Sequence, residues 1–154
     1  MELDLSGLLV AVIDDNRTMR HIVGTILRKC NVGCVVEAEN GAEALEQFEL
    51  VQPDVIFCDW VMKPISGIEF LHKVRAGEAK IDSNTPVIMM TSQVEAGQVL
   101  EAKRAGVSGY LAKPVTVGGI MARLLAVLGP EVGAAKPQKF AATVPHLSRV
   151  RSSA

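Results

Sequence analysis

Five short apolar segments alternate with five stretches of helical periodicity along most of this chain. The apolar segments cover residues 8–13, 34–38, 55–58, 86–90 and 110–112. Each is only a few residues long and largely aliphatic, which is typical of a strand buried on both faces of a parallel sheet. The alternation therefore predicts an α/β fold in which helices cover both faces of the sheet.

The segments between the strands carry apolar residues at the three- and four-residue spacing of an amphipathic helix. The first predicted buried face is formed by Met19, Ile22, Val23, Ile26 and Leu27. The last segment has the clearest periodicity, with Val117, Ile120, Met121, Leu124, Leu125 and Leu128. Polar residues that can cap a helix precede each segment, at Asn16, Asn40, Ser66, Ser92 and Thr116.

Strands joined by short helical crossovers have few ways to assemble. Right-handed crossovers and cover on both faces favour a flavodoxin-like doubly wound (βα)5 fold, with a five-stranded parallel sheet in the order 2-1-3-4-5. In this order the first and third strands are neighbours, so the residues that follow them lie close together. Ligands of such sheets bind at the carboxyl ends of the strands.

The composition places this fold in one domain. A chain of 154 residues with 49% hydrophobic residues can bury a continuous core. It has no apolar run of about 18 residues and no signal-peptide pattern, so we expect a cytoplasmic protein without membrane insertion. Its three cysteines, Cys30, Cys34 and Cys58, form no CxxC pair, which argues against a disulfide framework or a zinc site.

The charge divides the chain into two parts. Residues 1–129 carry 12 basic and 16 acidic residues, whereas residues 130–154 carry four basic residues and one acidic residue. The second part also has no convincing periodicity. We therefore expect a folded domain over 1–129 and a basic, flexible or docking tail over 130–154. The tail has few aromatic residues, so nucleic-acid binding is not expected.

Polar residues follow three of the predicted strands. Asp14 and Asp15 come after the first strand, Asp59 after the third, and Thr91 after the fourth. Carboxylates that converge at one edge raise one another's pKa unless a cation joins them. A cluster of oxygen ligands suits Mg²⁺ or Mn²⁺.

These motifs, in this order, resemble the receiver domain of two-component response regulators, and most closely its single-domain, CheY-like members. The resemblance rests on Asp14-Asp15, Asp59, Thr91-Ser92, Tyr110 and Lys113-Pro114, and it covers roughly residues 6–129. It implies that Asp59 accepts a phosphoryl group from a phosphohistidine on a sensor histidine kinase or a phosphotransfer protein. Such a module catalyses only its own phosphorylation and dephosphorylation and turns over no outside metabolite.

The resemblance also assigns the other site residues. It implies that Mg²⁺ is bound by Asp14, Asp15 and Asp59 together with the backbone carbonyl of Val61. Lys113, in a cis peptide bond with Pro114, would neutralise the phosphoryl oxygens, and Thr91 would donate a hydrogen bond to them.

The same resemblance implies a switch. Movement of Thr91 toward the phosphoryl group would let the ring of Tyr110 turn inward and change the surface of the fourth helix, fifth strand and fifth helix, which a downstream protein recognises.

Two features depart from the family's usual pattern. Lys63 stands four residues after Asp59, where many members have proline, and Pro64 follows it. Val61 and Gln93 occupy the two positions that border the phosphoryl group and tune its hydrolysis. Valine cannot orient a water molecule whereas glutamine can, so the lifetime of the phosphorylated state is left open.

Three other functions compete with the switch. A haloacid dehalogenase-type phosphohydrolase also uses an aspartate nucleophile at a strand end with Mg²⁺, but it needs a second aspartate where this chain has Val61. A flavodoxin-like FMN protein is disfavoured because Asp14 and Asp15 would repel the FMN phosphate. A phosphorylation-independent scaffold with a vestigial pocket stays open.

Overall fold

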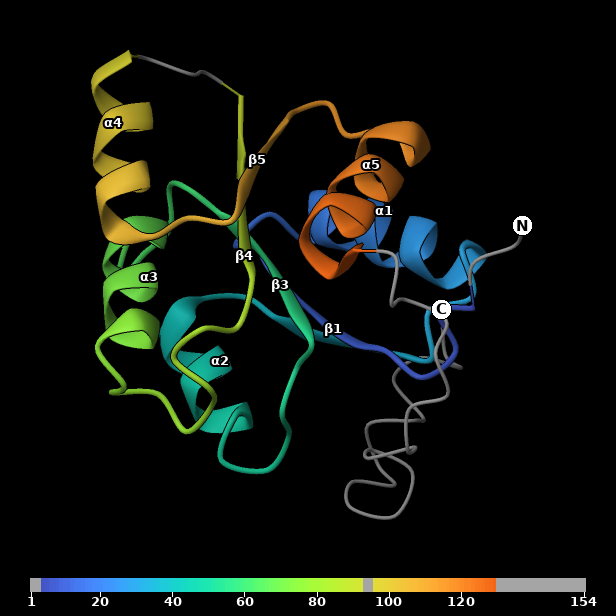
Figure 1. Cartoon of the computed structure of the whole chain (residues 1–154), viewed down its shortest axis with the longest axis horizontal. Helices are drawn as coiled ribbons and strands as arrows, with labels where there is room; N and C mark the ends of the chain where they lie inside the picture. Colours follow the sequence, from blue (N-terminus) through green and yellow to red (C-terminus); the bar gives the residue numbers. More distant parts are fainter. Residues whose placement is uncertain (1–3, 93–95, 130–154) are drawn as a thin grey trace.

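The computed structural model describes residues 4–92 and 96–129, which form five strands and five helices in alternation (Figure 1). The strands are β1 (Leu9–Ile13), β2 (Cys34–Ala38), β3 (Val55–Asp59), β4 (Val87–Thr91) and β5 (Gly109–Ala112). The helices are α1 (Arg17–Lys29), α2 (Gly41–Gln47), α3 (Gly67–Arg75), α4 (Ala96–Ala105) and α5 (Val117–Leu128). The predictions for Gln93 and for the tail at 130–154 lie outside the described residues.

All five strands pair in parallel, in the order β2-β1-β3-β4-β5, which confirms the predicted flavodoxin-like topology. The register brings the strand ends level with one another. Ile13 of β1 pairs with Cys58 of β3, and Asp59 of β3 pairs with Met90 of β4. The residues that leave β1, β3 and β4 therefore meet at one edge of the sheet.

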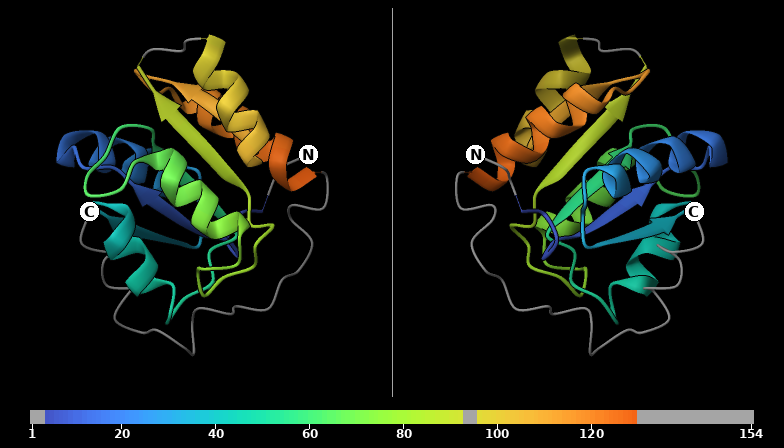
Figure 2. Two further views of the ribbon diagram at one scale, coloured as in Figure 1. Left: turned by 90° about the vertical axis from the view of Figure 1, so that its left-hand side faces the viewer. Right: turned by 90° about the vertical axis from the view of Figure 1, so that its right-hand side faces the viewer.

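Helices α2, α3 and α4 cover one face of the sheet, and α1 and α5 cover the other (Figure 2). Phe48, Phe70 and Ala102, which lie at the end of α2, in α3 and in α4, pack in one buried cluster. The second cluster is built on Val23 of α1 and Ile120 of α5. Alternate residues of each central strand enter opposite clusters, so these strands are buried on both faces, as their apolar sequences predict.

Side chains cap four of the helices at the predicted positions. The side chains of Asn16, Asn40 and Thr116 each accept a hydrogen bond from the backbone N–H three residues later. Ser66 and Glu69 form a reciprocal capping box at the start of α3. The cap predicted at Ser92 precedes residues 93–95, which lie outside the described residues.

Three apolar positions of the predicted helix faces are solvent-exposed. Ile22 of α1 is 40% exposed, and Val117 and Leu125 of α5 are 52% and 42% exposed. The apolar stripe of each helix is wider than the strip that contacts the sheet, so its margins stay in solvent. None of the helices among the described residues is long and apolar enough to cross a membrane.

Candidate functional site

The carboxyl edge of the sheet gathers the charged residues that follow different strands. Asp59 is the last residue of β3 and Asp14 directly follows β1. Both are buried, with exposed fractions of 7% and 0%, whereas Asp15 faces solvent. Lys113 directly follows β5 and reaches across this edge from the far end of the sheet.

Lys113 joins the two buried carboxylates. Its Nζ donates to Asp14 Oδ2 and to Asp59 Oδ1, at 3.1 Å in each case. The Lys113–Pro114 peptide is cis, as the resemblance implied, and so is Lys63–Pro64. The two hydrogen bonds place the ammonium group between the two carboxylates that sequence analysis assigned to this edge.

The electrostatics of this cluster are mixed. Burial and the neighbouring charge of Asp14 raise the pKa of Asp59 above its ordinary value of 3.8, although Lys113 opposes this shift. Burial lowers the pKa of Lys113, but the hydrogen bonds to Asp14 and Asp59 and the negative charges of these carboxylates together outweigh it, so the net pKa is raised. The carboxylate of Asp59 is thus held in an environment that needs further positive charge.

The raised pKa of Asp59 predicts a pH dependence of stability in the absence of metal. The folded protein holds the Asp59 proton more tightly than the unfolded chain does. This contribution to stability is therefore present at low pH and is lost as the pH rises through the raised pKa. We expect Asp59→Asn, which does not titrate, to become progressively more stable than the parent protein between the ordinary pKa of 3.8 and neutral pH.

Urea unfolding in a chelator, at a series of pH values, measures this difference. Saturating Mg²⁺ should remove the parent's disadvantage at neutral pH if the cation neutralises the cluster. Two stability curves that stay parallel across the whole pH range would contradict the assignment of the titration to Asp59.

The three carboxylates form a candidate cation site. One carboxylate oxygen from each of Asp14, Asp15 and Asp59 lies within 4.8 Å of the others. Hard oxygen donors at this spacing fit Mg²⁺ or Mn²⁺, which prefer carboxylates, carbonyls and water. The exposed Asp15 leaves one side of the cluster open to solvent, from which water ligands can come.

The remaining predicted residues are placed as follows. Thr91 ends β4 and is 8% exposed, so it lies buried beside the strand that carries Asp59. Val61 follows β3 in the next loop and is 73% exposed. Gln93 lies outside the described residues.

Tyr110 is connected to both helices that flank β5. Its hydroxyl donates to the carbonyl oxygen of Val99 in α4 at 2.7 Å, and its own carbonyl oxygen accepts from Arg123 Nε of α5. Its ring stacks on that of Trp60, with centroids 6.4 Å apart and an angle of 18° between the planes. From the sequence, the position of Trp60 directly after Asp59 suggests only a residue that shields the pocket, and it does not indicate this contact with Tyr110.

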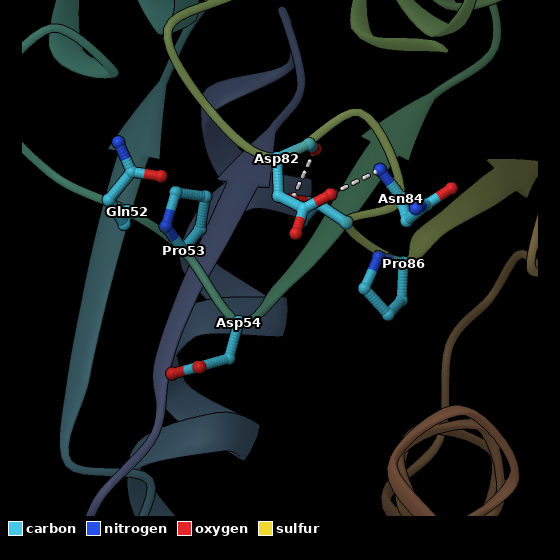
Figure 3. Close-up of a pocket in the computed structure, with 7 residues that line it drawn as sticks. Gln52, Pro53, Asp54, Asp82, Asn84 and Pro86 are labelled. Atoms are coloured by element: carbon cyan, nitrogen blue, oxygen red, sulfur yellow. Dashed lines mark hydrogen bonds between the residues drawn. The ribbon is translucent and has the colours of Figure 1, made fainter. Parts of the chain in front are cut away.

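A pocket lies at the opposite edge of the sheet (Figure 3). It has a volume of about 330 Å³ and is lined by Gln52, Pro53, Asp54, Asp82, Asn84, Thr85 and Pro86. Here the Asp54 carboxylate accepts a hydrogen bond from the Leu9 N–H, and the Asp82 carboxylate accepts one from the Asn84 N–H. Both carboxylates therefore stabilise the backbone of the loops at this edge. In the described part of the chain, the only cluster of three carboxylates close enough to share a metal ion is the one at the carboxyl edge.

Comparison with known proteins agrees with this geometry. A family model described as the response regulator receiver domain matches residues 10–125. The chemotaxis protein CheY-3 of Vibrio cholerae is 35% identical over 115 residues, covering 75% of this chain and 87% of the relative. The chemotaxis protein CheY of Pseudomonas aeruginosa is 36% identical over 107 residues, covering 70% and 85%.

A solved structure gives the same result for the fold. Vibrio cholerae CheY4 is 29% identical, with a TM-score of 0.72, and the match covers 78% of this chain and 98% of that one. Because the family model spans most of the chain and two relatives above 30% identity match along its length, the chain belongs to the response regulator receiver domains, CheY-like signalling modules of two-component systems.

Proposed function

We propose that this receiver domain is a phosphorylation switch, with Asp59 as the phosphoacceptor. The observation that carries the proposal is the placement of Lys113 Nζ, 3.1 Å from both Asp14 and Asp59 at the carboxyl edge of the sheet. The donor is a phosphohistidine on a sensor histidine kinase or phosphotransfer protein, and the output is a changed surface for a downstream protein. The receiver domain phosphorylates only its own Asp59 carboxylate, so we do not propose that it turns over an outside metabolite.

The chemistry is a simple displacement at phosphorus. An oxygen of Asp59 attacks the phosphoryl group, a new O–P bond forms, and the P–N bond to the donor histidine breaks with its electron pair leaving on the imidazole nitrogen. A carboxylate is a weak nucleophile and is repelled by the anionic donor, so positive charge at the site is required. Lys113 supplies one such charge, and the Thr91 hydroxyl is assigned a hydrogen bond to the transferred group.

The acidic cluster is assigned to a divalent cation. Asp14, Asp15 and Asp59 would hold Mg²⁺, with Mn²⁺ as a substitute, and the backbone carbonyl of Val61 is the proposed fourth protein ligand. When bound, the ion supplies positive charge that offsets the repulsion between the carboxylates and the phosphoryl oxygens.

Tyr110 is proposed to carry the change to the partner surface. The surface consists of α4, β5 and α5, and Tyr110 bonds to the two helices through its hydroxyl and its carbonyl oxygen. If Thr91 moves toward a phosphoryl group on Asp59, the ring of Tyr110 can turn inward and break its bond to Val99. Leu100 and Leu125, which are 49% and 42% exposed on α4 and α5, offer apolar contacts to a partner.

The lifetime of the phosphorylated state is assigned to Val61 and Gln93. Val61 is 73% exposed and its side chain has no polar atom, so it cannot orient an attacking water. The rate of hydrolysis would then depend on Gln93.

We propose the same division of the chain as in the sequence analysis, with the receiver domain over 1–129 and the basic tail over 130–154.

Mass measurement after incubation with a small phosphodonor tests the proposal. We expect the parent protein to gain the mass of one phosphoryl group when Mg²⁺ is present and to gain none in a chelator. No gain with Mg²⁺ would refute the switch and favour a phosphorylation-independent scaffold. Steady release of phosphate from a generic phosphomonoester would instead favour a phosphohydrolase.

A further inference from the structure

Asp14 is held by a hydrogen bond at each of its polar atoms. Its backbone N–H donates to the Ala38 carbonyl at 3.1 Å, and its Oδ1 accepts from the Asn16 N–H at 2.8 Å. Its Oδ2 accepts from Lys113, and its side chain is completely buried. The remaining polar atom of the residue is its backbone carbonyl oxygen, which accepts a hydrogen bond from an arginine.

That arginine is Arg20, one turn into α1. Its Nη1 donates to the Asp14 carbonyl oxygen at 2.7 Å, and its Nε lies 3.4 Å from Glu37 Oε1. The planar guanidinium thus spans from β2, which carries Glu37, to the first residue after β1. Only 16% of the Arg20 side chain is exposed, so the bridge is largely shielded from water.

We propose that Arg20 is a positioning residue that sets the affinity of the acidic cluster for Mg²⁺. It acts through Asp14, whose carbonyl it fixes against Glu37, and it does not itself touch the cation. The inference rests on the proposed function, since it assumes that Asp14, Asp15 and Asp59 bind the ion. Groups that orient a metal ligand typically change affinity by about 10- to 100-fold when they are removed.

A positioning role and a purely electrostatic role of Arg20 predict opposite changes in Mg²⁺ affinity when the residue is removed. Arg20 carries a positive charge near a cation site, so if it acted only through its charge, its removal would tighten Mg²⁺ binding. If it acts by holding Asp14, its removal weakens Mg²⁺ binding in spite of the lost repulsion. The direction of the change therefore distinguishes the two roles.

The chain offers a matched control in Arg28. Its Nη2 donates to Oε2 of the same Glu37 at 2.8 Å, and its side chain is 13% exposed, close to the value for Arg20. None of its hydrogen bonds reaches Asp14 among the described residues. Arg28→Met removes a similar charge and a bond to the same carboxylate, but leaves the Asp14 carbonyl bonded.

Calorimetric titration of the metal-free full chain with MgCl₂ tests the proposal, with unfolding midpoints in chelator as a check on folding. We expect Arg20→Met to raise the dissociation constant of Mg²⁺ about 10-fold. Arg20→Lys, which keeps the charge but cannot hold both oxygens, should also weaken binding. Arg28→Met should change binding by no more than about twofold.

Four results would overturn the inference. Tighter binding in Arg20→Met together with unchanged binding in Arg20→Lys would assign Arg20 to charge alone. Equal weakening in Arg28→Met would assign the effect to Glu37. Absence of Mg²⁺ binding in the parent protein would overturn the metal site of the proposed function, and this inference with it. Binding by the parent that Arg20→Met leaves unchanged would overturn this inference alone.

Discussion

Asp59→Asn is expected to abolish phosphoryl uptake while the protein stays folded. The amide has no anionic oxygen to attack phosphorus, so the mass gain should fall from about one phosphoryl group per chain to none. Folding should not suffer, because asparagine has nearly the same shape and removes the repulsion between Asp59 and the buried Asp14. Intact-protein mass spectrometry with a small phosphodonor and Mg²⁺ measures the first effect, and urea unfolding measures the second.

A matched control for this variant is Asp54→Asn, because Asp54 directly precedes β3 at the opposite edge of the sheet. The Asp54 carboxylate accepts from the Leu9 N–H at 2.9 Å, and an amide oxygen can accept the same bond. This variant should gain the phosphoryl group as the parent does. A full gain in Asp59→Asn would place the phosphoacceptor on another residue, whereas a loss in both variants would point to a general effect of the substitution.

The fold was predictable because its signals are local and agree with one another. Each strand is a short aliphatic run, four helices begin at a residue whose side chain caps them, and βα repetition leaves few topologies. The predicted order 2-1-3-4-5 then places the residues after β1 and β3 together without further information. Asp14 and Asp59 could therefore be assigned to one edge of the sheet from the sequence alone.

Contacts that depend on how the elements pack were not predictable. Arg20 lies six residues after Asp14, and its bond to the Asp14 carbonyl depends on the angle at which α1 leaves the sheet. The stacking of Trp60 on Tyr110 depends on the relative placement of residues that follow β3 and belong to β5. The positions of Arg20 and Trp60 in the sequence follow no motif that indicates these contacts.

The proposed switch residue Tyr110 and the proposed phosphoacceptor Asp59 are linked through one short piece of chain. Trp60 directly follows Asp59 and stacks on Tyr110, and its carbonyl oxygen accepts a hydrogen bond from the Gly67 N–H at 2.8 Å. A change in this piece of backbone would therefore affect both the placement of Asp59 and the ring that faces α4. The hydrogen bond from the Gly67 N–H holds this piece of backbone in place.

Gly67→Ala is expected to destabilise the protein by about 3 kcal/mol. A Cβ at this position would lie closer than 3.0 Å to both the Asp59 carbonyl oxygen and Met89 Cε, and 3.0 Å from the Trp60 Cα. The methionine end can move aside, but the two backbone atoms cannot, so the Gly67–Trp60 hydrogen bond and the start of α3 must shift. Urea unfolding measures the loss, and the mass assay should show slower phosphoryl uptake because Asp59 is displaced.

Gly118→Ala provides the control that separates this steric effect from the conformational effect of glycine. Both glycines lie in the first turn of a helix, and neither has a positive φ. A Cβ at Gly118 meets nothing within 4 Å, so alanine there should be neutral or more stable by up to about 1 kcal/mol, through its higher helix propensity. Equal stability of the two variants would show that the close approach of α3 to the Asp59 backbone is not what requires glycine at position 67. The inferred coupling of this turn to Asp59 would then lose its basis.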